Sequence, residues 1–229
     1  MKYGKMVHGR FVRKVNRFIA EVYINEEKEQ VHIKNTGRLK ELLQQGAEVL
    51  AEISKNPNRK TGYSLISVAK DGRWVNIDSQ APNAVAYEAL KAGRMVEFGA
   101  VKAVKREVTF GESRFDLYFE TENRKGVIEV KGVTLEENGI VMFPDAPTAR
   151  GTKHVLELIN AVQEGYIGVI LFVVQMNGCC QFTPNRDMDS DFADALLEAE
   201  RQGVQVIAYD TNVTEDEIHL NQALPIQLF

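Results

Sequence analysis

The sequence is poor in cysteine and has no long apolar run. Its only two cysteines, Cys179 and Cys180, are neighbours, so they cannot build a disulfide framework and lack the spacing of a zinc site. The longest unbroken stretch of apolar residues and glycine, residues 167–174, is far too short to cross a bilayer, and charges are spread through the first twenty residues. We therefore expect a protein of the reducing cytoplasm, with no signal peptide and no membrane span.

Positive and negative charges are unevenly distributed along the chain. The 229 residues have a net charge of −4 and are 44% apolar, which is enough for one large domain or two small ones. Residues 1–82 carry 15 Lys and Arg against 9 acidic residues, a net charge of +6, whereas residues 83–229 carry 13 against 23, a net charge of −10. This division indicates a basic module that grips a polyanion and an acidic module that acts on it, although ordinary surface variation produces the same pattern.

The first segment, which we place at residues 1–81, has the element order of an OB-type β-barrel. Three strands, a helix and two strands are predicted, in that order. The predicted strands are 11–15, 18–24, 30–34, 47–53 and 63–69, and the predicted helix is 38–45. Asn35 and Thr36 are residues that cap helix starts, and Gly37 permits a tight turn, so we interpret residues 35–37 as structural.

The connection between the last two strands, residues 54–62, is the predicted binding loop of this barrel. Lys55, Arg59 and Lys60 are its candidate phosphate contacts. A solvated turn rich in Asn, Pro and Gly explains the same residues equally well.

From residue 82 onward, in a second domain that we place at residues 82–229, the pattern changes to alternating helices and strands. Predicted helices lie at 84–92, 153–164 and 191–202, and predicted strands at 140–143, 167–175 and 204–209. The strand at 167–175 is almost continuously apolar, which is typical of a buried parallel strand. We expect a mixed sheet flanked by helices, with acidic groups near one edge.

Two further strands of this domain carry the residues with the clearest chemistry. Asp116 lies on one strand, and Glu129 and Lys131 lie on the next, where alternation makes their side chains point to the same face. Two carboxylates with a main-chain carbonyl suit Mg²⁺ at about 2.1 Å, or Mn²⁺, and phosphodiester hydrolysis requires such a cation. Lys131 could hold the attacking water and stabilise developing negative charge. The alternative is a cross-strand ion pair on a solvated sheet face.

The segment 143–154 places three cationic or ionisable side chains at a predicted helix start. Arg150, Lys153 and His154 would oppose the helix dipole there unless an anion is bound, so they are candidate phosphate contacts. The alternatives are an ion pair of Arg150 with Asp145 or Glu157, and packing of His154 at the edge of the apolar helix face.

Six runs of residues together resemble the sugar fermentation stimulation protein A (SfsA) family. These runs are residues 17–20, 32–37, 56–60, 113–116, 129–135 and 143–154. The resemblance implies an N-terminal OB-like domain, a C-terminal domain of the PD-(D/E)XK nuclease type, non-specific binding of DNA, and a role in the regulation of sugar (maltose) metabolism. It also implies that the nuclease acids and lysine are Asp116, Glu129 and Lys131.

The same resemblance implies a further acid on the helix that precedes the sheet, which would be Glu88. The alternative for Glu88 is an exposed helix glutamate. Three functions therefore remain open: a Mg²⁺- or Mn²⁺-dependent nuclease acting on single- or double-stranded DNA, a non-catalytic DNA-binding regulator, and an OB module for single-stranded RNA or oligosaccharide.

Overall fold

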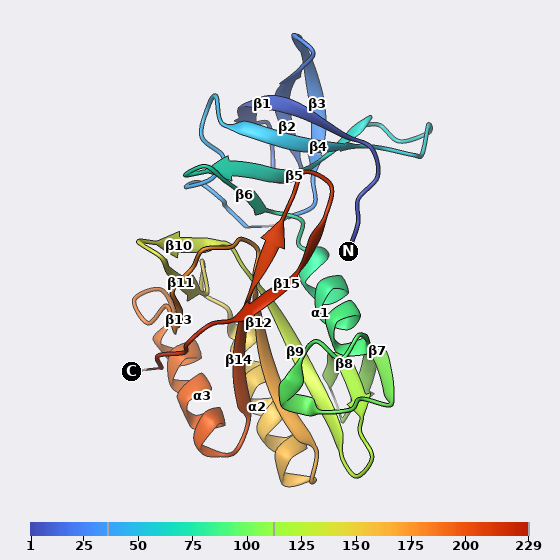
Figure 1. The fold of residues 1–229 in the computed structure, drawn as a ribbon. Helices are drawn as coiled ribbons and strands as arrows, with labels where there is room; N and C mark the ends of the chain where they lie inside the picture. Colours follow the sequence, from blue (N-terminus) through green and yellow to red (C-terminus); the bar gives the residue numbers. More distant parts are fainter. Residues whose placement is uncertain (36, 112, 229) are drawn as a thin grey trace.

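The computed structural model of the chain describes residues 1–35, 37–111 and 113–228. A β-barrel stands on one end of a domain that combines a sheet and helices (Figure 1). The C-terminal hairpin extends from the sheet toward the barrel, and the N-terminal segment pairs with its turn through Lys2 and Glu217. None of the helices in the described ranges has the length and apolar character that a membrane span needs.

The barrel is built from the first strands of the chain. These are β1 (Met6–Lys14), β2 (Ile19–Ile24), β3 (Glu27–Ile33), β4 (Glu48–Ile53), β5 (Tyr63–Lys70) and β6 (Arg73–Asn76). Their order in the sheet is β3-β2-β1-β4-β5-β6, and a parallel pairing between β3 and β5 closes five of them into a barrel. Val22, Val31, Val49 and Leu65 are fully buried in its core. The predicted OB-like barrel is therefore confirmed.

The predicted helix at 38–45 is wrong, because these residues form turns. Leu39 has a left-handed backbone with φ of 50°, which an α-helix of L-residues does not accommodate. The Asn35 side chain accepts a hydrogen bond of 2.7 Å from the Gly37 amide and so forms a turn of its own, while Thr36 lies outside the described residues. The apolar spacing that resembled a helix serves burial instead, since Leu39, Leu42 and Leu43 join the barrel core.

The second domain is a six-stranded mixed sheet. Its strands are β7 (Ala103–Phe110), β8 (Ser113–Glu120), β9 (Lys125–Val133), β12 (Ile167–Val174), β14 (Gln205–Val213) and β15 (Ile218–Ala223). The order is β15-β14-β12-β9-β8-β7, in which β9, β12 and β14 are parallel and the outer strands are antiparallel. A small second sheet contains β10 (Leu135–Glu137), β11 (Ile140–Phe143) and β13 (Gln181–Pro184).

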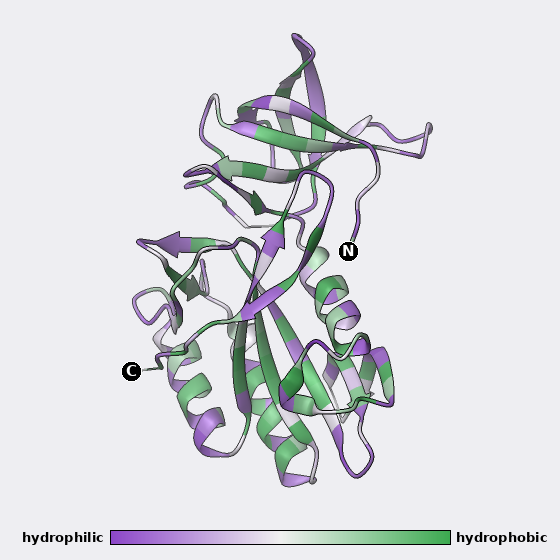
Figure 2. Ribbon diagram, viewed as in Figure 1, coloured by the Kyte–Doolittle hydropathy of each residue, from purple (hydrophilic) through white to green (hydrophobic). Residues whose placement is uncertain are grey.

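Helices cover both faces of the large sheet. They are α1 (Ala81–Lys91), the short 3-10 helix η1 (Val96–Phe98), α2 (Ala149–Gln163) and α3 (Ser190–Arg201). α1 packs on β7, β8, β9 and β15, whereas α2 packs on β9 and β12 and against α3. Figure 2 shows the central strands as largely hydrophobic, in agreement with the almost complete burial of β12. This arrangement is the mixed sheet flanked by helices that the sequence predicts.

A buried carboxylate fastens the barrel to the second domain. Glu136 of β10 accepts hydrogen bonds of 2.8 Å each from Lys70 and Arg73, which belong to the β5–β6 hairpin, and of 2.6 Å from the Gly139 amide. Arg73 also donates to the Asn177 carbonyl at 2.5 Å. Burial alone would raise the pKa of Glu136, but these hydrogen bonds and the two cations outweigh burial, so the pKa is lowered.

A second polar contact crosses the same boundary. The Gln175 side chain, just after β12, donates to Asn76 Oδ1 at 2.9 Å and to the Asp78 carbonyl at 3.1 Å. Asn76 in turn donates to the Tyr3 hydroxyl at 2.9 Å. Because Gln175, Asn76 and Asp78 are almost completely buried, the two domains are held in one defined orientation.

We predict that Glu136→Gln lowers the free energy of unfolding by about 2 kcal/mol at neutral pH, because a charged acceptor of several hydrogen bonds is lost. The lowered pKa sets the sign of the pH dependence. The stabilisation is complete above the ordinary glutamate pKa, about 4.3, and is lost as the pH falls through the folded-state value. Urea unfolding from pH 7 to pH 3 should show the two proteins converging in stability. The exposed neighbour Glu137→Gln is the control; equal stability of the Glu136 variant and the wild type at pH 7 would contradict the prediction.

Candidate active site

The site begins where two neighbouring strands part. The antiparallel ladder between β8 and β9 ends at the pair Leu117 and Ile128, so Asp116 and Glu129, the next pair in register, are not joined by it. The ladder between β7 and β8 is also interrupted opposite Asp116, where Glu107 has a left-handed φ of 54°. The main-chain pairing of β8 with β9 therefore stops before Asp116, whose carboxylate instead accepts a 2.8 Å hydrogen bond from the Val130 amide.

Glu129 lies beside this gap with one oxygen engaged and the other free. Only 3% of its surface is exposed. Its Oε1 accepts a 2.7 Å hydrogen bond from Lys131 Nζ and also contacts His154 Nδ1. Its Oε2 is buried and has no hydrogen-bond partner among the described residues. A buried carboxylate oxygen without a partner is costly, so this atom marks a place for a bound cation.

Asp116 is held from two sides. Besides the Val130 amide, the Asn83 side chain at the start of α1 donates to its Oδ1 at 2.6 Å. Burial raises the pKa of the Asp116 carboxyl above its usual range, the negative charge of Glu129 raises it further, and the two hydrogen bonds and Lys131 partly oppose this change. A divalent cation beside Asp116 would favour the ionised form of its carboxyl group.

The donor set fits a hard cation that retains water. Among the described residues, no group of three or more His, Cys, Asp or Glu side chains is arranged so that it could hold a metal ion. The described part of the protein therefore supplies at most two such ligands to a cation. Mg²⁺ is commonly bound by one or two carboxylates, with water and substrate phosphate oxygens completing its coordination. Asp116 and Glu129 supply that number of carboxylates, and the free Glu129 Oε2 supplies an unused ligand atom.

Glu88, the expected helix acid, is not brought into this cluster. Its carboxylate is 56% exposed and forms an ion pair with the N-terminal amino group at 2.6 Å. Five residues along an α-helix rotate a side chain by about 140°, so Glu88 faces away from the side of α1 on which Asn83 meets Asp116. Asn83 takes the place expected for the helix acid, and no pattern in the sequence distinguished it.

The structure brings together two of the three candidate phosphate contacts on α2, Arg150 and His154, and leaves Lys153 apart. α2 begins at Ala149, four residues before the predicted start, with Thr148 accepting a hydrogen bond from the Gly151 amide. Arg150 and His154 are one turn apart, and Arg150 Nε lies 3.5 Å from His154 Nε2. Neither ion pair considered for Arg150 forms within the described residues, and Lys153 is exposed outside the cluster. His154 also contacts Glu129 through its Nδ1, a contact that the sequence did not predict.

The barrel loop between β4 and β5 projects from the side of the barrel (Figure 1). Lys55 and Lys60 are exposed there, and Arg59 donates to Ser64 Oγ at 2.8 Å. Burial, followed by the charges of Arg59 and Lys34, lowers the pKa of His32 on the neighbouring strand. The structure thus gathers positive charge at this end of the barrel, without a contact between the loop and the carboxylates.

A cationic strip leads away from the carboxylates along α1. Tyr87 lies one helical turn after Asn83, and two cations from different elements approach its ring: Lys91 at 5.9 Å and Arg106 at 5.6 Å. Neither cation has a carboxylate partner within the described part of the chain. Lys105, next to Arg106 on β7, lies instead over the ring of Tyr118, on the other face of the sheet.

Comparison with known proteins covers the whole chain. The model of the SfsA N-terminal OB domain matches residues 12–77, and that of the sugar fermentation stimulation protein RE domain matches residues 80–217. A sugar fermentation stimulation protein homolog from Alkaliphilus oremlandii is 56% identical over 231 residues, which cover 99% of this chain and 98% of that protein. A homolog from Ruminiclostridium cellulolyticum is 47% identical and is matched over the full length of both chains.

A solved structure has the same fold throughout. It is that of Pyrococcus furiosus SfsA in complex with Ca²⁺, with a TM-score of 0.88 and 28% sequence identity, covering 99% of this chain and 98% of that one. At this level of similarity both domains and their order are shared.

We predict that Asp116→Ala speeds hydrogen exchange of the Val130 amide by roughly 10- to 100-fold, because a buried amide without an acceptor costs about 1–3 kcal/mol. Asp116→Asn is the matched control, since its amide oxygen can still accept this hydrogen bond. Exchange would be followed by NMR or by mass spectrometry of peptides that contain Val130. Equal protection in the alanine variant and the wild type would show that Asp116 does not hold the two strands together here.

Proposed function

The chain belongs to the sugar fermentation stimulation protein (SfsA) family, and we propose that it binds DNA without sequence specificity and hydrolyses DNA phosphodiester bonds with a divalent cation, Mg²⁺ or Mn²⁺. The observation that carries this proposal is the buried, unpartnered Oε2 of Glu129 beside the Asp116 carboxylate. The Ca²⁺ complex of the relative from Pyrococcus furiosus supports a divalent cation in this family.

Asp116 and Glu129 would hold the cation. Such an ion neutralises charge on phosphate oxygens and makes a water easier to deprotonate. The protein prepares the site by fixing both carboxylates: Val130 and Asn83 orient Asp116, while Lys131 and His154 occupy only one oxygen of Glu129. The remaining oxygen stays available to the cation, so the arrangement requires no large rearrangement on binding.

Lys131 is the residue that we assign to the attacking water. Its ammonium lies 2.7 Å from Glu129 and is only 15% exposed, so it is held next to the place where the phosphate must lie. There it can orient a water and donate a hydrogen bond to the negative charge that develops on phosphate. We also propose that Arg150, which is exposed and one turn from His154, contacts a phosphate at the outer side of the site.

Binding of DNA would rest on cations from both domains. Lys55, Arg59 and Lys60 on the barrel loop, with Lys153 and His154 at α2, remain our candidate contacts, and the strip at Tyr87 adds Lys91 and Arg106. These cations oppose the repulsion between DNA and the acidic second domain, whose residues 83–229 have a net charge of −10.

A second candidate function is a non-catalytic DNA-binding regulator of sugar (maltose) metabolism. The net negative charge of the second domain favours it, because such a surface repels DNA near the carboxylates wherever no cation is bound. The nuclease is favoured by the three residues Asp116, Glu129 and Lys131, since binding alone does not require a buried carboxylate with an unpartnered oxygen.

We predict cleavage of labelled DNA in the presence of Mg²⁺ or Mn²⁺ and none with EDTA. Glu129→Ala and Lys131→Ala should each lower the rate by about 10²- to 10⁴-fold, the range expected when a cation ligand or a positioned acid–base group is lost. Glu137→Ala, an exposed glutamate of β10, is the control and should cleave like the wild type. Binding without any cleavage, unchanged by the Glu129 and Lys131 substitutions, would favour the regulator.

We predict that Arg106→Ala weakens DNA binding by roughly 3- to 10-fold and reduces the slope of log affinity against log salt concentration by about 0.9, as expected for one lost phosphate contact. Lys105→Ala removes a cation from the adjacent position of the same strand, but on the opposite face, and should change neither quantity. Fluorescence anisotropy with labelled DNA from 50 to 200 mM salt would compare the two variants. An equal loss in both would mean that only overall charge matters.

A further inference from the structure

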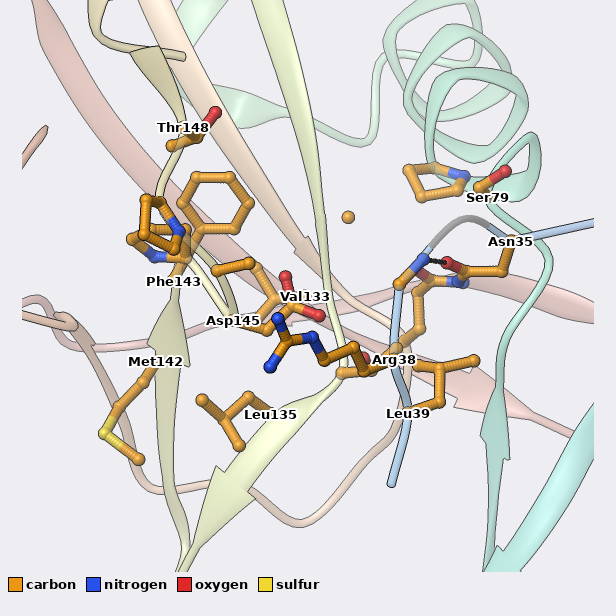
Figure 3. A pocket seen from close by; sticks show the side chains of 18 residues that line it. Asn35, Arg38, Leu39, Ser79, Val133, Leu135, Met142, Phe143, Asp145 and Thr148 are labelled. Carbon is orange, nitrogen blue, oxygen red and sulfur yellow. Dashed lines mark hydrogen bonds between the residues drawn. The ribbon is translucent and has the colours of Figure 1, made fainter. Parts of the chain in front are cut away.

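A cavity of about 400 Å³ lies between the two domains. One wall comes from the barrel, from Asn35 and residues 37–39. The other comes from residues 132–135, from the end of β9 to the start of β10, and from residues 142–148 before α2 (Figure 3). Its volume is within the range of small-molecule binding sites, about 300–1,000 Å³. None of the roles assigned above uses this cavity.

The cavity adjoins the carboxylate site along three separate elements. Gly132 lines it and directly follows Lys131; Pro82 lines it and directly precedes Asn83; Thr148 lines it at the start of the helix that carries His154. A Cβ atom on Gly132 would lie 2.6 Å from Gln175 Oε1 and 2.7 Å from Pro82 Cγ, so this wall is packed to the limit that glycine allows. A substrate whose phosphate lies at the carboxylates therefore has its neighbouring group at the mouth of the cavity.

The lining combines apolar surface with one free donor and one free acceptor. Leu135 and Met142 are partly exposed to the cavity. The Arg38 guanidinium and the Asp145 carboxylate extend into it from opposite walls (Figure 3). Neither of these two charged groups has a hydrogen-bond or ion-pair partner within 4.0 Å among the described residues. A flat, largely apolar ring with polar groups on its edge suits such a lining, and a nucleobase has this chemistry.

The position of the cavity between two walls also determines whether a paired and stacked base can enter it. A base within a duplex is stacked on both sides and paired to a second strand, so it cannot enter a cavity between two domains unless it leaves the stack. A base of a single strand, or one at a mismatch, leaves the stack at a smaller cost in free energy.

We propose that this interdomain cavity binds the nucleotide next to the scissile phosphate in an unpaired conformation, so that the protein acts on single-stranded or locally unpaired DNA. The proposal rests on the proposed function, because it places the scissile phosphate at Asp116 and Glu129. It adds the class of substrate and assigns base recognition to Arg38 and Asp145.

Equilibrium binding with Ca²⁺ in place of Mg²⁺ tests the proposal with the full-length protein; Ca²⁺ is the cation of the Pyrococcus furiosus complex. The probes are one labelled oligonucleotide as a single strand, as a perfect duplex, and as a duplex with one mismatch that contains 2-aminopurine. We expect at least 10-fold tighter binding of the first and third probes than of the perfect duplex, and a rise in 2-aminopurine fluorescence as the base leaves the stack. Leu135→Trp, which fills the cavity, should reduce this preference to less than 3-fold without changing the affinity for the perfect duplex.

Leu156→Trp is the matched control, because Leu156 is 47% exposed on α2 and does not line the cavity. If Leu135→Trp does not fold, as judged by circular dichroism, Arg38→Ala replaces it and should also lower the preference. Equal affinity for all three probes, a preference that survives in the cavity variants, or tight binding of a mononucleotide with no preference among the DNA probes would each overturn the proposal. Since no cleavage is measured, failure of the nuclease activity is detected separately, by the absence of products with Mg²⁺.

Discussion

The hydrogen bond from the Val130 amide to the Asp116 carboxylate is the interaction on which the site depends. It forms where β8 and β9 stop pairing, so a side chain replaces the main-chain bond that a continuous sheet would have. This hydrogen bond holds Asp116 next to the part of β9 that carries Glu129, whose Oε2 atom is buried and has no partner among the described residues. Two carboxylates, one of which has an oxygen that accepts no hydrogen bond from the described residues, are a suitable set of protein ligands for a hard divalent cation.

The junction between the domains gives this site its surroundings. Glu136 binds the β5–β6 hairpin of the barrel to the second domain, and Gln175, which directly follows β12, donates hydrogen bonds to Asn76 and Asp78 at the end of the barrel. Because Gln175 also lines the cavity and lies against Gly132, the same contacts that fix the domains shape the space beside Lys131. A basic barrel is thereby held next to an acidic domain, and residues that adjoin Lys131 and Asn83 in the sequence line the cavity at the boundary between them.

The sequence predicted what depends on local periodicity. Alternation along β9 placed Glu129 and Lys131 on one face, and the barrel and the mixed sheet followed from the order of the elements. The sequence did not predict the features that depend on a single backbone angle or on a contact between residues far apart in the chain. The left-handed φ of Leu39 replaces the predicted helix with turns, and the leucines of this segment are buried in the barrel core. The partners Asn83 and His154 are 33 and 25 residues from the acids they contact, and no local pattern reports such pairs.

The most direct test of the proposed metal site is to locate the cation. Crystals grown with Mn²⁺ would be measured at a wavelength where manganese scatters anomalously. If Asp116 and Glu129 hold the cation, a peak lies between the two carboxylates, within about 2.1–2.2 Å of Glu129 Oε2 and of one Asp116 oxygen. This peak should be absent in Glu129→Ala. Mn²⁺ bound only elsewhere, or an undisturbed Lys131–Glu129 pair with no peak beside it at saturating Mn²⁺, would contradict the central claim that these residues form a metal site.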